Sequence, residues 1–438
     1  MIDKDKIPAE VFVVLSKLQA NGFRSFIVGG SVRDLLLGKK PKDFDICTEA
    51  TSEIVKELFE KVIDTGVKFG TVTVLMGIPI EVTTFRKSVP FEDGQVVIGQ
   101  SETDDVKARD FTVNALLFDG REVIDCVNGL GDLQEKIIRT VGNPDCRFRE
   151  DALRMMRAIR LCCQLDFSIE QSTLHAVAGN AQLIKNVAQE RIKEELVKIL
   201  LSEVPSKGIR LMRKTGLLQY VLPELQLCYQ FDQCTPYHDK DVFDHTMSVL
   251  DNTPDNLVVR LAALLHDVAK PKTFSVDDNG TGHFYSHAVE GYALSKHILS
   301  RLKFDKKTID AVTILVKEHM SMLYVLRKAS VKKMVNRVGP DKILWLIDLQ
   351  IADKAGALLH GDFTYLQRLK TEVQKILDEK EPVSRKDLAI NGNDLIEHGV
   401  SPGPQLGKIL AQLLDEVICD PKINTKEDLL RLVSEWMG

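Results

Sequence analysis

The sequence has no hydrophobic run long enough to cross a bilayer, although 44% of its 438 residues are hydrophobic. Its beginning, MIDKDKIPAEVF, is charged and lacks the apolar core of a signal peptide. These absences argue against a membrane or secreted class, so we expect a soluble globular protein with no membrane partner. A chain of this length exceeds one ordinary domain and should form about two to four modules.

Cysteine pairs and an overall positive charge are also lacking. The eight cysteines form no CxxC spacing, although Cys162 and Cys163 are adjacent. Scattered cysteines indicate neither a zinc site nor a disulfide framework, so we expect reduced thiols and a cytoplasmic protein. The net charge of −5 gives no general attraction for nucleic acid, so any RNA contact must come from local basic patches. Nothing in the sequence indicates a protein partner.

What the sequence does contain is a change of pattern along its length. Strand-like and helix-like segments alternate up to about residue 125, and residues 72–85 predict a hairpin that turns at residues 77–79. After about residue 145 we expect the strands to end and long amphipathic helices to follow. Residues 378–386, DEKEPVSRK, are the best candidate for a linker. The predicted fold class is α+β, with a small α/β head before an extended all-α body.

The segment FIVGGSVRDLLLGKKPKDFDICT, residues 26–48, carries the strongest functional signal. An apolar run ends at Gly29 and Gly30, and a helix-like segment and a basic turn lead into a second strand. Asp43 and Asp45 are two apart on this strand, so their carboxylates share one side and suit hard divalent cations such as Mg²⁺. The glycines allow close approach of the backbone, and N–H groups at a helix start attract phosphate. Metal ions beside a phosphate cradle indicate nucleotidyl transfer.

This order of glycine pair, helix, turn and paired aspartates resembles the first motif of class II tRNA nucleotidyltransferases and bacterial poly(A) polymerases. Both belong to the DNA polymerase beta-like superfamily. The resemblance implies that Asp43 and Asp45 bind Mg²⁺. Arg33 and Asp34 look like the arginine and aspartate of the motif, although a structural ion pair at the helix start would use the same two residues. The nucleotide-binding residues implied here are Gly29, Gly30, Ser31 and Arg33.

Two further segments complete the expected catalytic site of the head. Glu81 precedes TTFR on a neighbouring strand, where a third carboxylate would complete the metal cradle; pairing with a lysine is the structural alternative. Residues 109–115, RDFTVNA, resemble the family's RRDFTxNA motif, which is associated with ribose selection. Arg109 would donate to phosphate or ribose oxygens, and Asp110 would accept from a ribose hydroxyl. The family's first arginine is replaced here by Ala108.

Residues 147–169 predict an arginine-rich amphipathic helix with an apolar stripe that includes Leu153 and Met156. On its own, this pattern also fits arginines on a solvated face. The run EDALR, however, resembles the family's EDxxR motif. Asp151 and Arg154 are three residues apart, so we expect both side chains to project from one face of the helix.

The chemistry of the bases gives this spacing a function. Cytosine and adenine both present an amino donor beside a ring-nitrogen acceptor, an order that matches the carboxylate of Asp151 and the guanidinium of Arg154. Guanine and uracil reverse the order, and each buried group left unpaired costs about 1–3 kcal/mol. We therefore expect Asp151 and Arg154 to read C and A without a nucleic-acid template. Arg157 and Arg160 lie on or near the same face and would contact triphosphate or RNA backbone.

Seven of the ten histidines lie between His238 and His319, a concentration that indicates a second site. Their order, with the pair His266–Asp267 and a distant aspartate, closely resembles the ligand order of HD-domain metal phosphohydrolases. Imidazoles and carboxylates suit a transition metal such as Mn, Ni, Fe or Co, with an open position for an activated water. The resemblance implies phosphatase or cyclic-phosphodiesterase activity on RNA ends; the alternative is a scaffold. The expected metal ligands are His245, His266, Asp267, His287, His319 and Asp353.

The C-terminal part is expected to bind RNA. A Gly/Pro-rich loop at residues 399–407 leads into a helix and can offer backbone N–H groups to RNA phosphates, although a plain helix–helix connection fits equally well. The family resemblance favours a tRNA-binding tail, and residues 189–192 resemble a later motif that braces the body. The expected modules are a nucleotidyltransferase head (1–144), a helical neck with the base-reading motif (145–225), an HD-type helical body (226–380) and a helical tail (381–438).

The sequence thus predicts template-independent addition of C, C and A to the 3′ end of tRNA from CTP and ATP, by two-metal nucleotidyl transfer. The segment between Arg86 and Arg109 looks shorter than in CCA-adding relatives and lacks their basic residues, which leaves a CC-adding enzyme open. The run GKKPKDFDI looks like poly(A) polymerases, and an A-adding tRNA enzyme is a related alternative. An alternative from another class is an HD phosphohydrolase or RNA-end repair protein whose head only binds nucleotide.

Overall fold

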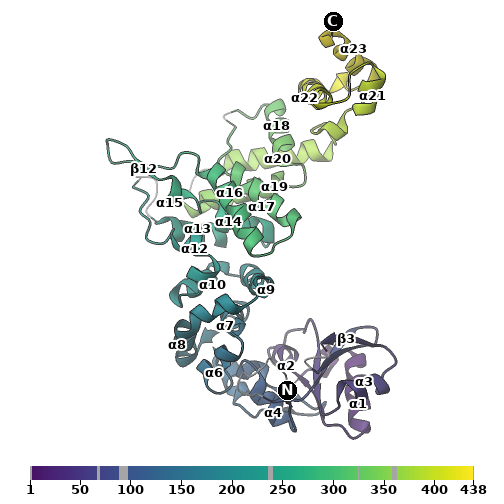
Figure 1. The fold of residues 1–438 in the computed structure, drawn as a ribbon, viewed down its shortest axis with the longest axis vertical. Coiled ribbons are helices and arrows are strands. Elements are labelled where there is room, and N and C mark those ends of the chain that lie inside the picture. Colours follow the sequence, from purple (N-terminus) through teal and green to yellow (C-terminus); the bar gives the residue numbers. More distant parts are fainter. Residues whose placement is uncertain are drawn as a thin grey trace. The chain divides into compact units, whose positions relative to one another are not determined.

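The computed structural model describes residues 2–66, 70–87, 97–234, 240–323, 325–357 and 363–437. The chain forms two compact units, Met1–Val221 and Leu222–Gly438, and each has its own arrangement of elements (Figure 1). None of the described helices is both long and apolar enough to span a membrane. Residues 88–96, which are part of the segment expected to separate CC from CCA addition, lie outside the described ranges.

Over the described ranges, the first unit builds a seven-stranded mixed sheet in the order β3-β4-β5-β2-β1-β8-β9. Neighbouring strands are antiparallel except β2 and β5, which run parallel. The hairpin predicted for residues 72–85 consists of β4 and β5, and Gly77 in its turn has a φ of +84°. A separate short pair joins β6 (Arg86–Lys87) to β7 (Val97–Ile98). The strands of the main sheet are β1 (Ser25–Val28), β2 (Asp45–Thr48), β3 (Val62–Gly66), β4 (Thr71–Leu75), β5 (Pro79–Thr84), β8 (Leu117–Phe118) and β9 (Val123–Ile124).

The sheet is covered on both faces because successive strand side chains point to opposite sides. Ile27 of β1 packs in one buried cluster with Leu15 of α1 (Ala9–Ala20). Its neighbour Phe26 belongs to the other cluster, which includes a residue of α4 (Glu102–Ala108). Figure 1 shows α1 and α3 together beside the sheet. The remaining helical elements of the head are α2 (Gly30–Leu36), α3 (Ser52–Leu58), α5 (Gly129–Glu135) and the 3₁₀ turns η1 (Lys4–Lys6) and η3 (Thr112–Asn114).

The arginine-rich segment forms two helices, α6 (Pro144–Glu150) and α7 (Leu153–Leu165). The chain turns between them at Asp151, which has extended backbone (φ −147°), and the Asp151 carboxylate accepts the N–H of Leu153 at the start of α7. The prediction of one helix over residues 147–169 is therefore wrong, although the predicted apolar stripe is buried. The rest of this unit contains α8 (Gln171–Asn180), η4 (Ala181–Asn186), α9 (Gln189–Leu200), α10 (Pro205–Lys214) and α11 (Leu218–Val221).

Short strands continue beyond residue 145, contrary to prediction. β10 (Ile137–Ile138) pairs in parallel with β11 (Ser168–Ile169), and β12 (Ser275–Val276) pairs with β13 (Gly282–His283). Asp166 ends α7 in the left-handed conformation and turns the chain toward β11. Strands of two residues show no alternation in the sequence, so periodicity could not indicate them.

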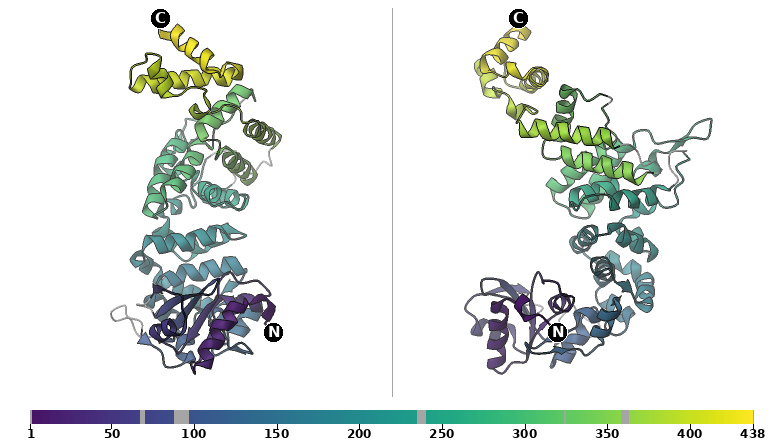
Figure 2. Two further views of the ribbon diagram at one scale, coloured as in Figure 1. Left: turned by 90° about the vertical axis from the view of Figure 1, so that its right-hand side faces the viewer. Right: turned by 180° about the vertical axis from the view of Figure 1, so that it is seen from behind.

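The second unit is largely helical, and Figure 2 shows its longer helices lying side by side. Within it, α13 packs against α14 and α19, and α17 packs against α14 and α16. The helices are α12 (Pro223–Gln226), α13 (Val242–Asp251), α14 (Leu257–Leu265), α15 (Lys270–Thr273), α16 (His287–Arg301), α17 (Lys306–Glu318), α18 (Lys328–Val338), α19 (Ile343–Gly356), α20 (Thr364–Asp378), α21 (Gly392–Glu397), α22 (Pro404–Cys419) and α23 (Lys426–Met437), with 3₁₀ turns η5 (Arg385–Asp387) and η6 (Pro421–Ile423).

The tail has a small core of its own, built from apolar residues between Leu388 and Val433. The predicted linker follows α20, but Glu381 within it pairs at 2.7 Å with Lys332 of α18, whose side chain is 1% exposed. The segment between α20 and the tail is therefore fixed to α18 by the buried ammonium group of Lys332. The predicted Gly/Pro loop ends earlier than expected, because Pro404 starts α22 at the position that favours proline and Gly407 lies inside the helix.

Candidate active site and candidate metal centre

Three carboxylates expected to hold metal lie near one another in the head. Asp45 opens β2 and is the register partner of Glu81 on the parallel strand β5. Asp43 lies just before this strand, and its side chain is exposed. Burial, followed by the charges of Glu81 and Asp43, raises the pKa of Asp45 to about 6. The carboxylates therefore repel one another, and the oxygen-rich group fits a hard divalent cation that would relieve this repulsion.

The glycine turn lies directly beside these carboxylates and has a backbone conformation that favours glycine. Gly29 caps α2 with a φ of +82°, a conformation that favours glycine. A Cβ on Gly29 would lie 3.5 Å from a guanidinium nitrogen of Arg109 and 3.7 Å from Asp45 Oδ2. Gly30 begins α2, and Ser31 is buried with its hydroxyl donating to the Val28 carbonyl at 3.1 Å. The Ser31 hydroxyl thus fastens the turn, while the backbone N–H groups of the turn are left to form the predicted phosphate cradle.

Arg33 and Asp34 form the structural ion pair that was the alternative to a catalytic role. Arg33 donates from Nε and Nη2 to Asp34 Oδ1 at 2.9 and 2.7 Å. Its other terminal nitrogen donates to Asn114 Oδ1 at 2.5 Å. Asn114 also donates to Asp110 Oδ1 at 3.2 Å, so it links α2 to the RDFTVNA segment. Nucleotide binding by Arg33 stays a prediction.

Arg109 is held by a carboxylate that the sequence analysis did not single out. Asp105 on α4 is completely buried and accepts from Arg109 Nε and Nη2 at 2.9 and 2.7 Å. Its other oxygen accepts the backbone N–H of Arg86 at 3.2 Å. The i, i+4 spacing of Asp105 and Arg109 was the signal available in the sequence. Asp105 fixes the guanidinium of Arg109 beside Gly29 and Asp45.

Asp110 contacts a neck arginine in this structure. Arg157 donates from Nε to Asp110 Oδ2 at 2.8 Å, and Asp110 Oδ1 accepts the N–H of Phe111. Burial alone would raise the pKa of Asp110, but the charge and hydrogen bond of Arg157 outweigh it and hold that pKa below its usual range. Arg160 pairs in the same way with Glu195 at 3.0 Å. Asp110, Arg157 and Arg160 are thus already paired within the protein. To contact ribose, triphosphate or RNA as predicted, each would have to bind a further partner.

The base-reading pair is arranged differently from the prediction of a single helix face. Asp151 lies in the turn before α7 and not on the helix, and it pairs with Arg191 of α9 at 2.7 Å. Arg154, on the first turn of α7, pairs with Glu150 at 2.6 Å and donates to the carbonyl of Ala108 at 3.2 Å. The expectation that both side chains project from one helix face is thus wrong, because the Asp151 side chain caps α7. Their role in reading bases stays a prediction.

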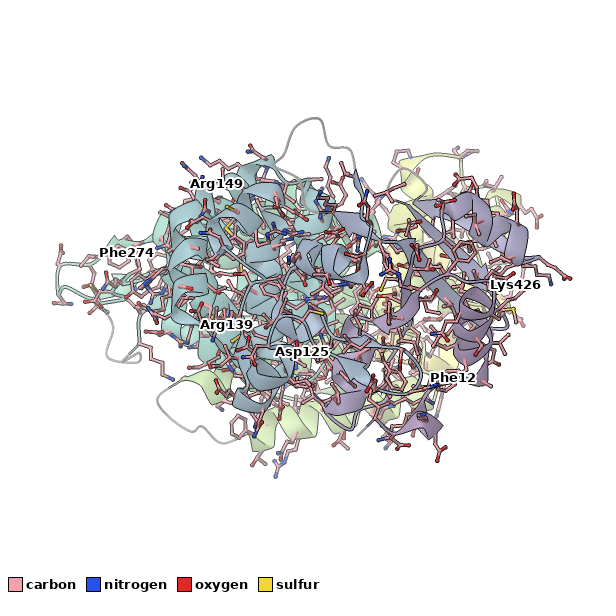
Figure 3. The ribbon with its side chains drawn as sticks, turned by 90° about the horizontal axis from the view of Figure 1, so that it is seen from below. Phe12, Asp125, Arg139, Arg149, Phe274 and Lys426 are labelled. Carbon is pink, nitrogen blue, oxygen red and sulfur yellow. The ribbon has the colours of Figure 1, made fainter. Side chains whose placement is uncertain are left out.

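The arginines of α6 and α7 do not form one solvated face. Arg149 is exposed, and its side chain points outward at the margin of the helices in Figure 3. The others pair with carboxylates: Arg147 and Arg154 with Glu150, Arg157 with Asp110, and Arg160 with Glu195.

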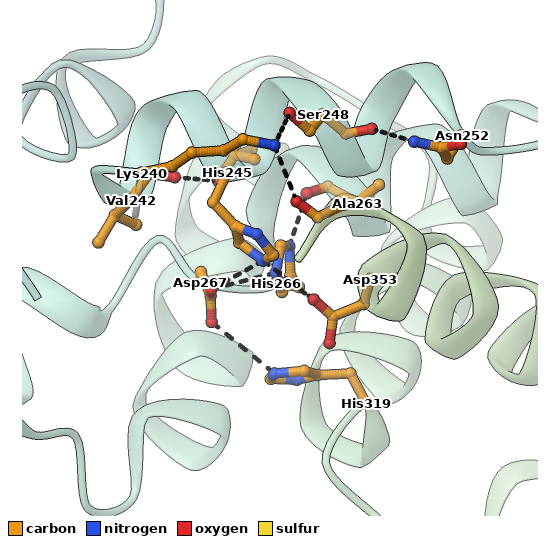
Figure 4. Close-up of polar contacts among 12 residues, drawn as sticks. Lys240, Val242, His245, Ser248, Asn252, Ala263, His266, Asp267, His319 and Asp353 are labelled. Carbon is orange, nitrogen blue, oxygen red and sulfur yellow. Dashed lines mark hydrogen bonds and ion pairs between the residues drawn. The ribbon is translucent and has the colours of Figure 1, made fainter. Parts of the chain in front are cut away.

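The six predicted ligands of the second site converge in the second unit, and Figure 4 shows His245, His266, Asp267, His319 and Asp353. Two sets of side chains have all their ligand atoms within 4.8 Å of one another, namely His245, His266 and Asp267, and Asp267, His287 and His319. Asp353 from α19 joins them at 2.9 Å from His245 Nε2. All of these ligands except His266 line a cavity of about 430 Å³, together with Lys270, His283 and Tyr285. Residues from α13, α14, α16, α17 and α19 or the turns after them thus meet at one point.

Backbone contacts fix the orientation of three of these histidines. Nδ1 of His266, His287 and His319 lies 2.8, 2.8 and 2.7 Å from the carbonyl three residues earlier in each case. A carbonyl only accepts, so each Nδ1 carries a hydrogen, and Nε2 is the nitrogen that would bind a metal. Nε2 of His287 lies 3.3 Å from Nε2 of His319. Two lone pairs that face each other call for a cation between them, either a proton or a metal ion.

The titration of the cluster agrees with this geometry. Burial alone would lower the pKa of His266, but the charge of Asp267 outweighs it and raises that pKa to about 9. Burial, followed by the charge of His266, lowers the pKa of His319 to about 4. One imidazolium thus forces its neighbour to stay neutral. The imidazole and carboxylate donors fit a transition metal in the place of that proton.

Models of known families match most of the chain. Residues 25–139 match the poly A polymerase head domain. Residues 166–228 match the "Probable RNA and SrmB- binding site of polymerase A". Residues 288–433 match domain 2 of tRNA nucleotidyltransferases.

Individual relatives match over nearly the whole length. The CCA-adding enzyme of Levilactobacillus brevis is 34% identical over 439 residues, which covers 96% of each chain. The crystal structure of the Bacillus stearothermophilus CCA-adding enzyme in complex with CTP is 27% identical, covers 98% of this chain and 96% of its own, and superposes with a TM-score of 0.76. The Thermotoga maritima CCA-adding enzyme complexed with tRNA shares the fold at 22% identity, with a TM-score of 0.57 and coverage of 98% and 96%.

Proposed function

This chain belongs to the family of CCA-adding enzymes, and we propose on that premise that it adds C, C and A to the 3′ end of tRNA from CTP and ATP. The observation that carries the proposal is the group formed by Asp43, Asp45 and Glu81 beside the glycine turn at Gly29. Carboxylates gathered beside a glycine turn at the start of a helix suit the metal ions and the phosphate groups that nucleotidyl transfer requires.

Asp43, Asp45 and Glu81 would hold Mg²⁺, which when bound supplies positive charge to the attacking 3′-oxygen and to the departing pyrophosphate. The backbone N–H groups at Gly29 and Gly30 would hold the triphosphate at the start of α2. Arg109, oriented by its buried partner Asp105, would donate to a phosphate or ribose oxygen; its guanidinium beside Gly29 supports this role. Positioning of the two reactants by fixed donors accounts for much of the catalysis in this class of reaction.

Base selection would fall to Asp151 and Arg154. In this structure Arg191 holds the Asp151 carboxylate, and Glu150 holds the Arg154 guanidinium. A cytosine or adenine amino group would donate to Asp151, and its ring nitrogen would accept from Arg154. Arg191 and Glu150 would thus orient the two reading groups before a base arrives.

The direct test uses the purified full chain and a tRNA that ends before its CCA. CTP alone should extend this tRNA by two nucleotides, ATP alone should not extend it, and both together should give three additions. Growth that stops at two cytidines in the presence of ATP would instead identify a CC-adding enzyme. Addition of a single A only to tRNA that already ends in CC would identify an A-adding enzyme, and a long ladder with ATP alone would identify a poly(A) polymerase.

A second activity is favoured by the facing Nε2 atoms of His287 and His319. We propose that the histidine cluster is an HD-type site that binds Mn, Ni, Fe or Co and hydrolyses phosphate esters at RNA ends. His245, His266, Asp267, His287, His319 and Asp353 would hold the metal, which when bound supplies an activated water. Lys270, which lines the cavity and pairs with Asp267 at 2.8 Å, would place a positive charge beside the substrate phosphate. Metal analysis of the purified chain tests the first half of this proposal.

The division of labour along the chain is also proposed. The head (1–144) would catalyse transfer, the neck (145–225) would read the base, the body (226–380) would carry the HD-type site and the tail (381–438) would bind tRNA. The tail has its own buried core, against which Ala329 of α18 also packs. Removal of residues 381–438 should raise the KM for tRNA and leave the KM for CTP unchanged. The cytoplasmic location predicted from the cysteines stays a prediction.

A further inference from the structure

A cavity of about 570 Å³ opens beside α4 in the first unit. Basic residues from three elements line it: Lys87 of β6, Lys107 of α4 and Arg147 of α6. Val127 and Val141 add an apolar surface. The cavity therefore suits a ligand that has both a phosphate and an apolar part.

This cavity is separate from the nucleotide site expected at Gly29. Asp105 of α4 pairs with Arg109, the residue that follows the helix, and the Arg109 guanidinium reaches toward Gly29 and Asp45. Lys107 lies roughly 160° around the helix from Asp105, given about 100° per residue. A ligand bound against Lys107 would therefore lie on the opposite side of α4 from the catalytic carboxylates.

The positive charge of the cavity is only partly balanced by its own lining. Asp104, the carboxylate among the described lining residues, accepts the N–H of Gln100 at 3.0 Å and so helps to begin α4. Lys87 and Lys107 are exposed and carry long, flexible side chains. The chain as a whole carries a net charge of −5, so a local excess of positive charge marks a place where a polyanion is attracted.

One wall of the cavity is bonded directly to the base-reading residues. Arg147 is 9% exposed, donates to the Lys107 carbonyl at 2.9 Å and pairs with Glu150 at 2.6 Å. The other oxygen of Glu150 pairs with Arg154 at 2.6 Å, and Arg154 donates to the Ala108 carbonyl. The two arginines thus donate to neighbouring carbonyls at the end of α4. A ligand bound by Arg147 would be linked through Glu150 to Arg154, which is expected to read the base.

We propose that this cavity binds a backbone phosphate of the tRNA substrate and so holds the RNA beside the base-reading residues. The proposal rests on the tRNA nucleotidyltransferase activity proposed above. Ammonium groups act as compact point charges for phosphate oxygens, and the guanidinium of Arg147 adds fixed, planar donors. A Cβ added to Gly142, which lines the cavity, would meet nothing within 4 Å, so the cavity is open at this residue. The triphosphate of a free nucleotide offers the same chemistry, and the experiment separates the two sources.

The experiment measures binding of a tRNA that lacks CCA to the full chain carrying Lys87→Gln and Lys107→Gln, over a series of salt concentrations. The matched control is Lys61→Gln, since Lys61 is an exposed lysine of the same unit that does not line the cavity. The double variant should bind tRNA about tenfold more weakly, and the slope of log K against log salt should fall by about 1 to 2, one phosphate contact per lost charge. Steady-state assays should show a higher KM for tRNA, with kcat and the KM for CTP unchanged.

Each other outcome counts against the cavity as an RNA site. Equal affinity and an equal salt slope in the double variant and the wild type would overturn the proposal. A higher KM for CTP with unchanged tRNA binding would also overturn it, because a free nucleotide would then be the ligand. A loss in the Lys61→Gln control equal to that in the double variant would show a general charge effect and would reject a specific site. Failure of the wild-type chain to extend tRNA would instead overturn the proposed function, so the two failures are distinguishable.

Discussion

The head and the histidine cluster gather carboxylates in opposite electrostatic environments. Asp45 lies among carboxylates, and burial together with the charges of Glu81 and Asp43 raises its pKa to about 6. Asp267 lies among histidines and beside Lys270; burial alone would raise its pKa, but the charges of His266 and Lys270 hold it well below its usual range. In the head site, the positive charges of Arg109 and Arg86 do not offset the burial of Asp45 and the repulsion by its neighbouring carboxylates, while in the histidine cluster the positive charges outweigh the burial of Asp267.

This difference explains why the two sites favour different cations. The head offers only oxygen ligands, of which those of Asp43 and Glu81 are exposed, and such a set suits hydrated Mg²⁺. The cluster offers buried imidazoles whose other nitrogen is fixed by a backbone carbonyl. Preformed nitrogen ligands suit a transition metal. The comparison predicts that substitutions at one site change that site's chemistry alone.

The largest expected effect is the loss of nucleotide addition in Asp45→Ala. Removing the central carboxylate should reduce addition by on the order of 10³-fold or more, because the charge of the metal at the reacting oxygens is lost. Binding of tRNA should stay within about twofold, since Asp45 is expected to make no base contact. Primer-extension assays and filter binding measure the two quantities. Asp43→Ala should behave alike, and Asp64→Ala, at an exposed strand residue of the same sheet, is the control. Near-normal turnover in either active-site variant would show that Asp43 and Asp45 are not the catalytic Mg²⁺ ligands.

The next prediction concerns the histidine cluster. The double variant His266→Ala, Asp267→Ala should lose bound transition metal and any phosphatase activity but should keep wild-type nucleotide addition. Metal content by mass spectrometry and hydrolysis of a phosphate ester test the first part, and primer extension tests the second. His175→Ala, at an exposed histidine of α8, is the control. Metal content equal to that of the wild type in the double variant would leave the cluster as a scaffold.

Base choice should change by a smaller factor. Arg154→Ala should weaken the use of CTP and ATP together, each by about 10- to 100-fold, the equivalent of one charged hydrogen bond. Asp151→Ala should relax the rejection of UTP and GTP. Competition assays with all four nucleotides measure both effects. A variant that loses ATP alone would contradict a shared reading pair for both bases.

The dependence of the head site on pH follows from the raised pKa of Asp45. Below about pH 6 a proton occupies this carboxylate and competes with the cation. The Mg²⁺ concentration for half-maximal nucleotide addition should therefore rise by up to about tenfold for each pH unit below 6. Above pH 7 it should be constant. A Mg²⁺ requirement that does not change between pH 5 and pH 7 would contradict the raised pKa of Asp45.

The smallest effects are on stability, and their signs should differ between the sites. The folded-state pKa of Asp45 is raised, so the folded head loses stability as pH rises through the interval from 3.8 to about 6. Asp45→Asn should therefore stabilise the metal-free head at pH 7 by about 1–3 kcal/mol. The folded-state pKa of Asp267 is lowered, so its carboxylate stabilises the fold above pH 4 and this contribution is lost as pH falls. Asp267→Asn should accordingly destabilise the second unit.

Thermal unfolding at pH 7 with a chelator present measures both variants against the wild type. A lower melting temperature for Asp45→Asn would contradict the prediction that ionised Asp45 destabilises the fold. A higher one for Asp267→Asn would contradict the prediction that ionised Asp267 stabilises it. Both asparagine variants keep the volume of the side chain, so the test isolates the charge.

Much of the catalytic head could be predicted from the sequence. The glycine pair, the aspartates and Glu81 lie in short motifs, and the alternation of the strands placed Asp45 and Glu81 on neighbouring elements. The histidine cluster was also predictable, because the order of its ligands is specific even though they span residues 245 to 353. The break at Asp151 was not predictable, since the apolar period continues across it, and the extended backbone of Asp151 that ends α6 appears only in the folded chain.

The sequence by itself determined the order of the motifs, the helical or extended character of most segments, and which residue types are present for metal and base chemistry. These properties follow from local periodicity and spacing. Only the tertiary structure decided which charge neutralises which. Arg157 meets Asp110 across 47 residues, and Arg191 meets Asp151 across 40. Such pairs depend on separations of about 3 Å between side chains that are far apart along the chain, and no periodicity in the sequence encodes that distance.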